Sequence, residues 1–385
     1  MRLTSNIDFK NFNINGNKNK ILNLLFKILK KKNQIIDSLK KDYKYPLKKL
    51  NIYNFKKYSK VNLIGMGGSS LGAKAIYNFL KHKIGRKFFF IDNLETENKS
   101  NSKGQLINLI ISKSGNTLET IANSNILIKK HHKNIFITEN KNSYLRNLAE
   151  KLKAEIFDHN NYIGGRYSVL SEVGMIPAQL MGLKSFKFKQ YDKLIKNKFF
   201  LDSLVMNVSN TLTLIKKKKY NSVILNYDKK SNDLFFWYQQ LIAESLGKNN
   251  KGIFPIISNL PKDNHSLMQY YLDGPKINFY TFFYVNDETS LRVKNKDLLK
   301  SHSFLKNKTI NDIKFSQYIA TQNVFESKKI PFRSFFINKR NEETMGELFT
   351  FFILETILLG KAMKLNAFDQ PAVELIKIDT KKKLI

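Results

Sequence analysis

Two segments of the sequence combine glycines with hydroxyl side chains, the composition of loops that bind oxygen-rich anions. The first, GMGGSSLGA at residues 65–73, carries glycines at 65, 67 and 68 followed by two serines. The second, ISKSGNTLET at residues 111–120, carries four hydroxyls, those of Ser112, Ser114, Thr117 and Thr120. Glycines permit a tight turn and a close approach of the backbone, and a helix that begins at the loop adds unpaired amides and the positive end of its dipole. We interpret both segments as anion-binding loops, the second suited to a phosphate dianion.

Neither loop has the signature of a common nucleotide-binding loop. Ser70 stands where the third glycine of GxGxxG would be, and no Gly-Lys-Ser/Thr follows as it does in a Walker A loop. A strand-to-helix turn without a ligand remains the alternative for the first loop, and a Ser/Thr-rich helix cap remains the alternative for the second. Two such loops in succession favour a ligand more than either loop does alone.

A third segment, GGRYSVLSEVG at residues 164–174, places an arginine after two glycines. The guanidinium of Arg166 does not lose its charge, so it could stabilise an oxyanion that develops during a reaction. The alternative is a surface arginine in a turn, and this segment alone does not decide between the two.

In this order the segments resemble those of the glucose-6-phosphate isomerase family. The loops at residues 65 and 111 resemble its two sugar isomerase (SIS) domain loops, and residues 164–168 resemble its GGRYS signature. QLIAESLGK at residues 240–248 resembles the segment with the family's catalytic glutamate, DNHSLMQ at 263–269 the one with its catalytic histidine, and FDQPAVELIK at 368–377 its C-terminal signature. The matches run from about residue 61 to residue 377.

The resemblance implies an isomerase that interconverts glucose 6-phosphate and fructose 6-phosphate in glycolysis and gluconeogenesis. Glu244 would be the base that moves a proton between C1 and C2 through a cis-enediol intermediate, a role that needs a carboxylate within reach of a carbon acid. His265 would assist opening of the sugar ring, and Lys377 would act at the same end of the substrate. Arg166 would stabilise the enediolate.

The resemblance also implies which residues bind the substrate. For the phosphate these are Ser112, Lys113, Ser114, Thr117 and Thr120. For the sugar these are Gly68, Ser69, Gln240 and Gln370. Phosphate binding, remote from C1 and C2, would then position the reacting carbons.

The resemblance implies neither a metal nor another cofactor. His131 and His132 are neighbours at a lysine-rich helix end, and we interpret them as solvated residues rather than metal ligands. Family members are generally dimers in which the catalytic histidine reaches the neighbouring subunit's site. We therefore expect a homodimer to which each subunit contributes His265 across the interface.

Two alternative functions stay open. A bifunctional enzyme would also isomerise mannose 6-phosphate, because the enediol has lost the stereochemistry of C2. A non-catalytic SIS-type regulator would bind a sugar phosphate with the loops at residues 65 and 111 but would need no base. In such a regulator Glu244, His265 and Lys377 would have no reason to occur together.

The elements that position these residues follow an α/β pattern. Short apolar runs at residues 61–64, 88–91, 106–111 and 135–138 alternate with amphipathic stretches at 73–81, 118–130 and 144–151. A long lysine-rich helical stretch over 185–219 precedes a second alternation, with strands at 223–225, 253–257, 279–285 and 332–337 and helices at 234–246 and 342–365. This pattern predicts two mainly parallel sheets, each flanked by helices in three layers.

We divide the chain accordingly into four parts. A helical segment at residues 1–45, with apolar helical spacing over 21–40, precedes a first SIS-type domain at 46–190 that carries the phosphate-binding loops. A second SIS-type domain at 191–366 carries Glu244 and His265, and a C-terminal segment at 367–385 carries Lys377. Ligands of such sheets bind beyond the carboxyl ends of the strands, so we expect the site there.

Composition argues against nucleic-acid and membrane partners. The net charge of +35 comes mostly from lysines spread over the whole chain, which we attribute to compositional drift rather than to nucleic-acid binding. No apolar run reaches the roughly 20 residues of a membrane helix, and residues 1–23 read poorly as a signal peptide. Because the chain has no cysteine, we expect a reducing compartment such as the cytoplasm. Because no apolar run is long enough to span a bilayer, we expect no membrane association.

Overall fold

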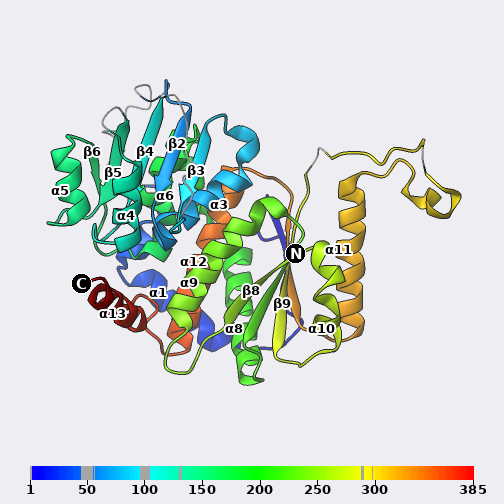
Figure 1. Cartoon of the computed structure of the whole chain (residues 1–385). Coiled ribbons are helices and arrows are strands. Elements are labelled where there is room, and N and C mark those ends of the chain that lie inside the picture. The colour runs from blue at the N-terminus through cyan, green and yellow to red at the C-terminus, as the bar shows by residue number, and fades with distance from the viewer. Residues whose placement is uncertain are drawn as a thin grey trace.

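The computed structural model contains two five-stranded sheets joined by long helices (Figure 1). It describes residues 2–44, 55, 57–95, 105–129, 132–287, 290–296 and 298–385. The two sheets lie side by side in Figure 1, with helices α9 (Asn232–Leu246) and α12 (Glu342–Ala362) between them. The predicted fold class, with parallel strands flanked by helices in three layers, is confirmed.

All five strands of the first sheet are parallel, in the order β3-β2-β4-β5-β6. The strands are β2 (Lys60–Ile64), β3 (Lys87–Ile91), β4 (Leu106–Ile111), β5 (Lys133–Thr138) and β6 (Glu155–Asp158). Alternate side chains of each strand point to opposite faces. One face, with Leu63 and Leu109, packs on α3 (Leu71–Phe79) and α6 (Glu172–Leu180), and the other, with Ile110, packs on α4 (Leu118–Leu127) and α5 (Tyr144–Lys151).

The second sheet has the order β1-β10-β9-β7-β8 and one antiparallel edge. Its parallel strands are β7 (Asn221–Asn226), β8 (Phe254–Asn259), β9 (Asn278–Val285) and β10 (Phe332–Ile337), and β1 (Ile7–Lys10) runs antiparallel to β10. The face with Phe283 packs on α8 (Lys198–Lys216), α9 and α12. The face with Phe282 packs on α10 (Met268–Asp273) and α11 (Ile310–Ser327).

One hydrophobic cluster continues from the first sheet into the second. It includes Leu63 from β2, Leu241 from α9, Phe352 from α12 and Phe335 from β10. Helix α12 is apolar around most of its circumference and is buried over nearly its whole length, which is typical of a core helix. This shared core fixes α9, and the side chains on it, relative to the loops of the first sheet.

Most of the predicted elements are confirmed, and β4, β10 and α5 have the predicted bounds. Two helical stretches that we predicted as continuous are interrupted. The 185–219 stretch begins with a 3₁₀ helix, Ser185–Phe188, and the short α7 (Tyr191–Leu194). Asn197 then caps α8 by accepting a hydrogen bond from the amide of Phe200 at 3.2 Å. Asn33 separates α1 (Lys18–Lys30) from α2 (Gln34–Asp37) in the same way. Asparagine is among the favoured N-cap residues, so both interruptions have a local cause.

Several elements were not predicted, among them β1, β6, α6, α10 and α11. Our division of the chain near residue 45 lies outside the described residues, while β1 joins a part of the chain that we assigned as helical to the edge of the second sheet. The C-terminal segment ends in α13 (Glu374–Leu384), which exposes Leu375, Ile376 and Ile378. None of the helices in the described part of the chain is long and apolar enough to span a membrane.

Candidate active site

The first glycine-rich loop lies where β2 ends and α3 begins, and it fits tightly against its surroundings. Gly67 has a φ of +53°, and a Cβ there would lie 2.8 Å from Nε2 of Gln240. A Cβ on Gly68 would lie 2.1 Å from the carbonyl carbon of Gly165, and one on Gly65 would lie 2.8 Å from the carbonyl oxygen of Ile111. Only glycine allows these approaches. The loop therefore contacts the second loop, the GGRYS segment and α9 at once.

The second loop joins β4 to α4 and presents its hydroxyls near a helix N-terminus. Oγ of Ser112 and Oγ1 of Thr117 are hydrogen-bonded at 2.9 Å, and Thr117 is the N-cap residue of α4. Gly115 has a φ of +66° and packs against Ser143. The hydroxyl of Thr120 is buried and has no hydrogen-bond partner among the described residues. A buried polar atom without a partner is uncommon, so this hydroxyl has hydrogen-bonding capacity that the described residues do not use.

Lys113 lies in the same loop, half-buried beside a carboxylate. Its ammonium is 3.7 Å from Oε1 of Glu139, the residue that follows β5. Desolvation lowers the pKa of Lys113, and the charge of Glu139 acts in the opposite direction. Glu139 is also paired with Lys141, so the two lysines and one carboxylate together carry a net positive charge beside the loop.

Arg166 is almost completely buried, with 1% of its side chain exposed, and all five of its N–H groups are hydrogen-bonded. Nε donates to Oγ of Ser245 at 2.8 Å. One terminal nitrogen, NH1, donates to Oε2 of Glu244 at 3.2 Å and to Oε1 of Gln370. The other, NH2, donates to the carbonyl oxygens of Ala367 and Asp369 at 2.9 and 3.0 Å. The guanidinium thus joins α9 to the C-terminal segment.

Glu244 lies on α9 one turn after Gln240, so both side chains occupy the same face of the helix. Nε2 of Gln240 donates to Oε1 of Glu244 at 3.1 Å, while Arg166 donates to Oε2. The Glu244 side chain is 30% exposed. Oε1 of Gln240 is buried without a partner among the described residues, so it could accept a hydrogen bond from a ligand hydroxyl. The carboxylate is therefore oriented from both sides and still accessible.

Comparison with known families shows which family the chain belongs to. The sequence profile described as phosphoglucose isomerase matches residues 30–255, which is more than half of the chain. The chain belongs to the phosphoglucose isomerase family. A glucose-6-phosphate isomerase from Methanocaldococcus jannaschii is 33% identical over 339 residues, covering 82% of this chain and 82% of the relative.

Solved structures show that the fold is that of the phosphoglucose isomerase family. A hypothetical protein from Thermus thermophilus superposes with a TM-score of 0.82 at 22% identity, covering 95% of this chain and 94% of the other. A glucose-6-phosphate isomerase from Chlamydia trachomatis superposes with a TM-score of 0.73 at 18% identity, covering 94% of this chain and 77% of the other. The two sheets therefore have the arrangement of this family.

Two residues predicted as catalytic from the phosphoglucose isomerase resemblance are exposed side chains in the single chain. His265 is exposed in the short 3₁₀ helix Lys262–His265 that follows β8. Lys377 lies on α13, with 65% of its side chain exposed, and pairs with Glu374 at 2.7 Å. Among the described residues, neither His265 nor Lys377 forms a hydrogen bond or an ion pair with Glu244 or Arg166. Their roles stay predictions.

The remaining predicted substrate residues lie in the two loops and in the C-terminal segment. Gly68 is buried against the GGRYS segment, Ser69 is partly exposed beside it, and Ser114 is exposed at the tip of the second loop. Gln370 is exposed at the end of the segment that Arg166 holds.

Three residues that contact this group were not predicted as site residues: Ser245, Tyr167 and Lys248. Lys248, at the end of α9, forms an ion pair with Asp369 and lowers the pKa of that carboxyl group through the hydrogen bond between them.

The histidine pair expected to be solvated differs in part from that expectation. His132 is partly buried, and its Nδ1 lies 3.2 Å from the side-chain nitrogen of Asn108 in the buried part of β4. His131 lies outside the described residues. Within the described ranges, no group of three or more His, Asp or Glu side chains could hold a metal ion.

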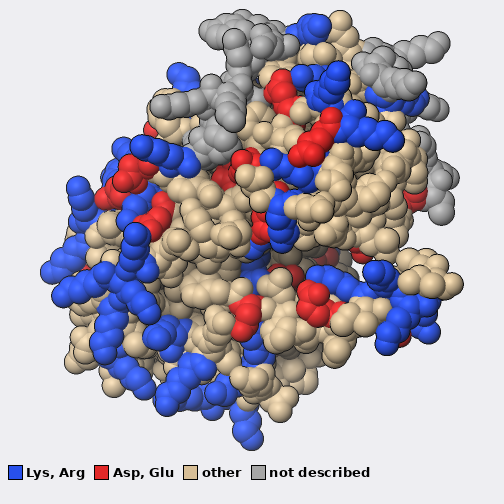
Figure 2. Space-filling model, turned by 90° about the vertical axis from the view of Figure 1, so that its left-hand side faces the viewer, with Lys and Arg blue, Asp and Glu red and all other residues tan. Residues whose placement is uncertain are grey.

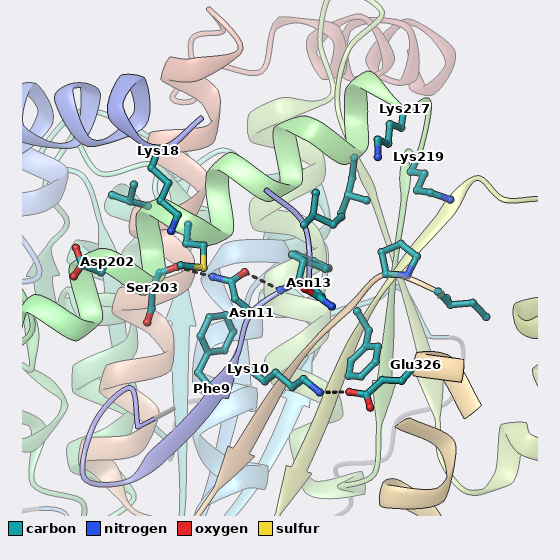
Figure 3. Close-up of a pocket in the computed structure, with 18 of the residues that line it drawn as sticks. Phe9, Lys10, Asn11, Asn13, Lys18, Asp202, Ser203, Lys217, Lys219 and Glu326 are labelled. Carbon is teal, nitrogen blue, oxygen red and sulfur yellow. Dashed lines mark hydrogen bonds and ion pairs between the residues drawn. The ribbon is translucent and has the colours of Figure 1, made fainter. Parts of the chain in front are cut away.

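A large cavity lies elsewhere, at the amino-terminal ends of the second sheet's strands. It measures about 1340 Å³ and is lined by β1, the segment that follows it, α8 and residues 326–332 (Figure 3). Its rim carries five lysines with Asp202 and Glu326, a mixture close to that of the whole chain. None of the predicted site residues lines this cavity, and its composition does not indicate a ligand.

Proposed function

We propose that this protein is a glucose-6-phosphate isomerase that interconverts glucose 6-phosphate and fructose 6-phosphate. The observation that carries the proposal is the position of the Glu244 carboxylate. It is held between Gln240 and Arg166, beside two hydroxyl-rich loops at the carboxyl ends of parallel strands. A sugar-phosphate regulator needs the loops but no such carboxylate, so the geometry favours an enzyme.

The phosphate binds in the second loop in this proposal. The hydroxyls of Ser112 and Thr117, which bond to each other in this structure, turn to the phosphate oxygens, and the ammonium of Lys113 supplies charge. The sugar then extends past Gly68 toward α9. Lys and Arg side chains are spread over much of the face shown in Figure 2, and such a field attracts anionic substrates.

Proton transfer is assigned to Glu244. In the aldose-to-ketose direction the carboxylate takes the proton from C2, which leaves a cis-enediolate, and returns it to C1. The oxyanion needs an N–H donor, yet every N–H of Arg166 is already bonded in the free protein. NH1 is the group to supply it, because its partners Glu244 and Gln370 are side chains, whereas NH2 is held by backbone carbonyls.

We also propose a homodimer in which His265 of each subunit completes the other subunit's site. His265 is exposed, as this role requires. Two further surfaces support the proposal. The segment before α11 projects from the body in Figure 1 and exposes Leu291, Leu299 and Phe304 by 81%, 75% and 68%. Helix α13 has no buried residue and exposes its apolar side chains. Burial of these side chains by a partner would be favourable.

We also propose that the protein is located in the cytoplasm.

Purified protein tests the function. It should convert fructose 6-phosphate to glucose 6-phosphate in a coupled assay, in the presence of a chelator. Glu244→Gln should lose nearly all turnover and keep its affinity for fructose 6-phosphate. Glu150→Gln, which changes an exposed carboxylate on α5, is the matched control and should keep full turnover. An inactive native protein, or an active Glu244→Gln variant, would overturn the proposal. Mannose 6-phosphate in the same assay tests the bifunctional alternative.

Mixed dimers test the contribution of His265. Glu244→Gln and His265→Ala homodimers should each be inactive. If His265 acts across the interface, a mixed dimer of the two variants contains one site with both native residues, so mixing and reassembly should restore activity. Failure of a reassembled mixture to recover activity would contradict the cross-subunit arrangement.

A further inference from the structure

The hydroxyl of Ser245 is the acceptor for Nε of Arg166, and it continues into a chain of hydrogen bonds. Oγ of Ser245 lies 2.9 Å from the hydroxyl oxygen of Tyr167, which lies 2.9 Å from the carbonyl oxygen of Ala367. Both Ser245 and Tyr167 have 0% exposed surface. Burial raises the pKa of Tyr167, so its hydroxyl keeps its proton.

The direction of every bond in this chain follows from counting hydrogens. The carbonyl of Ala367 can only accept, so the single hydrogen of Tyr167 goes to it. Tyr167 must then accept at its oxygen, and Ser245 donates to it. Ser245 in turn uses a lone pair to accept from Nε of Arg166. The chain therefore runs one way, from the cation through two hydroxyls to a carbonyl, and each bond strengthens the next.

This chain of hydrogen bonds fixes the plane of the guanidinium at its Nε edge. Ser245 is adjacent to Glu244 on α9, so Arg166 is held by neighbouring residues of one helix turn, by Nε to Ser245 and by NH1 to Glu244. The carbonyl oxygen of Ala367 accepts hydrogen bonds from both the hydroxyl of Tyr167 and NH2 of Arg166. With Nε and NH2 fixed, the directions of the two NH1 hydrogens are fixed too, and in the free protein Glu244 and Gln370 accept from them.

We propose that Ser245 and Tyr167 are positioning residues that set the direction of the NH1 donor of Arg166 toward the enediolate. The inference rests on the isomerase function proposed above. It assigns no contact with substrate to either hydroxyl. Loss of the chain therefore affects the stabilisation of the enediolate more than the binding of the sugar phosphate.

Ser245→Ala removes the acceptor of Nε and the donor to Tyr167. We expect kcat to fall about 10-fold to 100-fold, in line with displacement of a stabilising group by about 1 Å, with KM for fructose 6-phosphate changed less than about 2-fold. Affinity for a phosphorylated five-carbon aldonic acid, whose carboxylate mimics the enediolate, should fall by a similar factor to kcat. Tyr167→Phe removes one oxygen, and its loss of kcat should be smaller because the bond from Nε remains.

The double variant Ser245→Ala/Tyr167→Phe tests whether the two hydroxyls act as one unit. Its kcat should be no lower than that of Ser245→Ala, because Ser245→Ala alone already removes the hydrogen bonds that join Arg166 to Tyr167. Tyr238→Phe is the matched control, because Tyr238 also lies on α9 with a buried hydroxyl, bonded to Arg333 and Glu355 instead. It should unfold at a lower denaturant concentration and keep its kcat.

The outcomes separate this inference from the proposed function. An inactive native protein would overturn both. An active native protein with unchanged kcat in Ser245→Ala and Tyr167→Phe would overturn the positioning role alone. Equal rises of KM for substrate and of Kd for the enediolate mimic would also overturn it, because a purely structural defect in the site affects both ligands alike.

Discussion

Gly68→Ala changes the closest backbone contact in the site. The added Cβ would lie 2.1 Å from the carbonyl carbon of Gly165, 2.3 Å from its oxygen and 2.6 Å from the amide nitrogen of Arg166. Ordinary contact of a Cβ begins at 3.4 Å, so the two segments must separate by about 1.3 Å in that direction. Both contacting groups are backbone, which side-chain rotation cannot relieve.

The expected size of the effect follows from this displacement. Overpacking of this kind costs about 1–3 kcal/mol of unfolding free energy. A shift of about 1 Å in a catalytic group can cost on the order of 100-fold in rate, and the group displaced here is Arg166. Gly68→Ala should therefore lose about 100-fold in kcat while it remains folded at 25 °C.

The assays are urea unfolding and the coupled isomerase assay at saturating fructose 6-phosphate. Gly165→Ala is the matched control for stability, since it lies on the other side of the same contact and its Cβ would have no neighbour nearer than 3.6 Å. Gly85→Ala, with nothing within 4 Å, is the control for activity. If Gly68→Ala kept kcat within about 2-fold and unfolded at the native urea concentration, the reasoning from this contact would be refuted.

Three further predictions concern the phosphate loop, the core and the pH dependence of stability. Thr117→Ala removes the partner of Ser112 and one phosphate donor, so KM for fructose 6-phosphate should rise about 10-fold at nearly constant kcat, as measured by steady-state kinetics. Arg333→Met leaves Glu355 as an unpaired buried charge and should cost about 3–5 kcal/mol in urea unfolding, with kcat unchanged at 25 °C. Burial lowers the pKa of Lys189 from 10.5 to about 7, so the unfolded chain binds more protons than the folded one between these values. Native stability relative to Lys189→Met should therefore rise with pH from about 7 to 10, as measured by urea unfolding at several pH values.

Each of these has a contrary result. A fall in kcat without a rise in KM for Thr117→Ala would place that hydroxyl near the reacting carbons instead of the phosphate. A loss of stability below about 1 kcal/mol for Arg333→Met would mean that Glu355 finds water or another partner. A pH-independent difference between native protein and Lys189→Met would show that the lysine has the same pKa in both states.

How far the sequence predicts the fold depends on how local each signal is. Strand β4 is an apolar run broken only by Asn108 and is buried on both faces, so its bounds were predictable from the run itself. Strand β1 has four residues, and what makes it a strand is pairing with β10, more than 300 residues away. Helix α11 has only three buried side chains and little amphipathic contrast, so its pattern predicts neither helix nor strand clearly.

The same distinction applies to the site. The motifs around Arg166 and Glu244 were recognisable, and the structure brings these two side chains together. It was not predictable that all five N–H groups of Arg166 are hydrogen-bonded. Two of the acceptors are the backbone carbonyls of Ala367 and Asp369, which any residue would supply. His265 shows a third limit: a side chain that serves a neighbouring subunit, as we propose, has no partner to reveal it within one chain.

The central claim, that Glu244 carries a proton between C1 and C2, is tested most directly by isomerisation in D₂O followed by ¹H NMR. A carboxyl group that holds the proton exchanges it with solvent during the lifetime of the enediol. The native protein should therefore place deuterium at C2 of glucose 6-phosphate and at C1 of fructose 6-phosphate, and Glu244→Gln should place none. Turnover of the native protein without any deuterium incorporation, or incorporation by Glu244→Gln at the native rate, would contradict it.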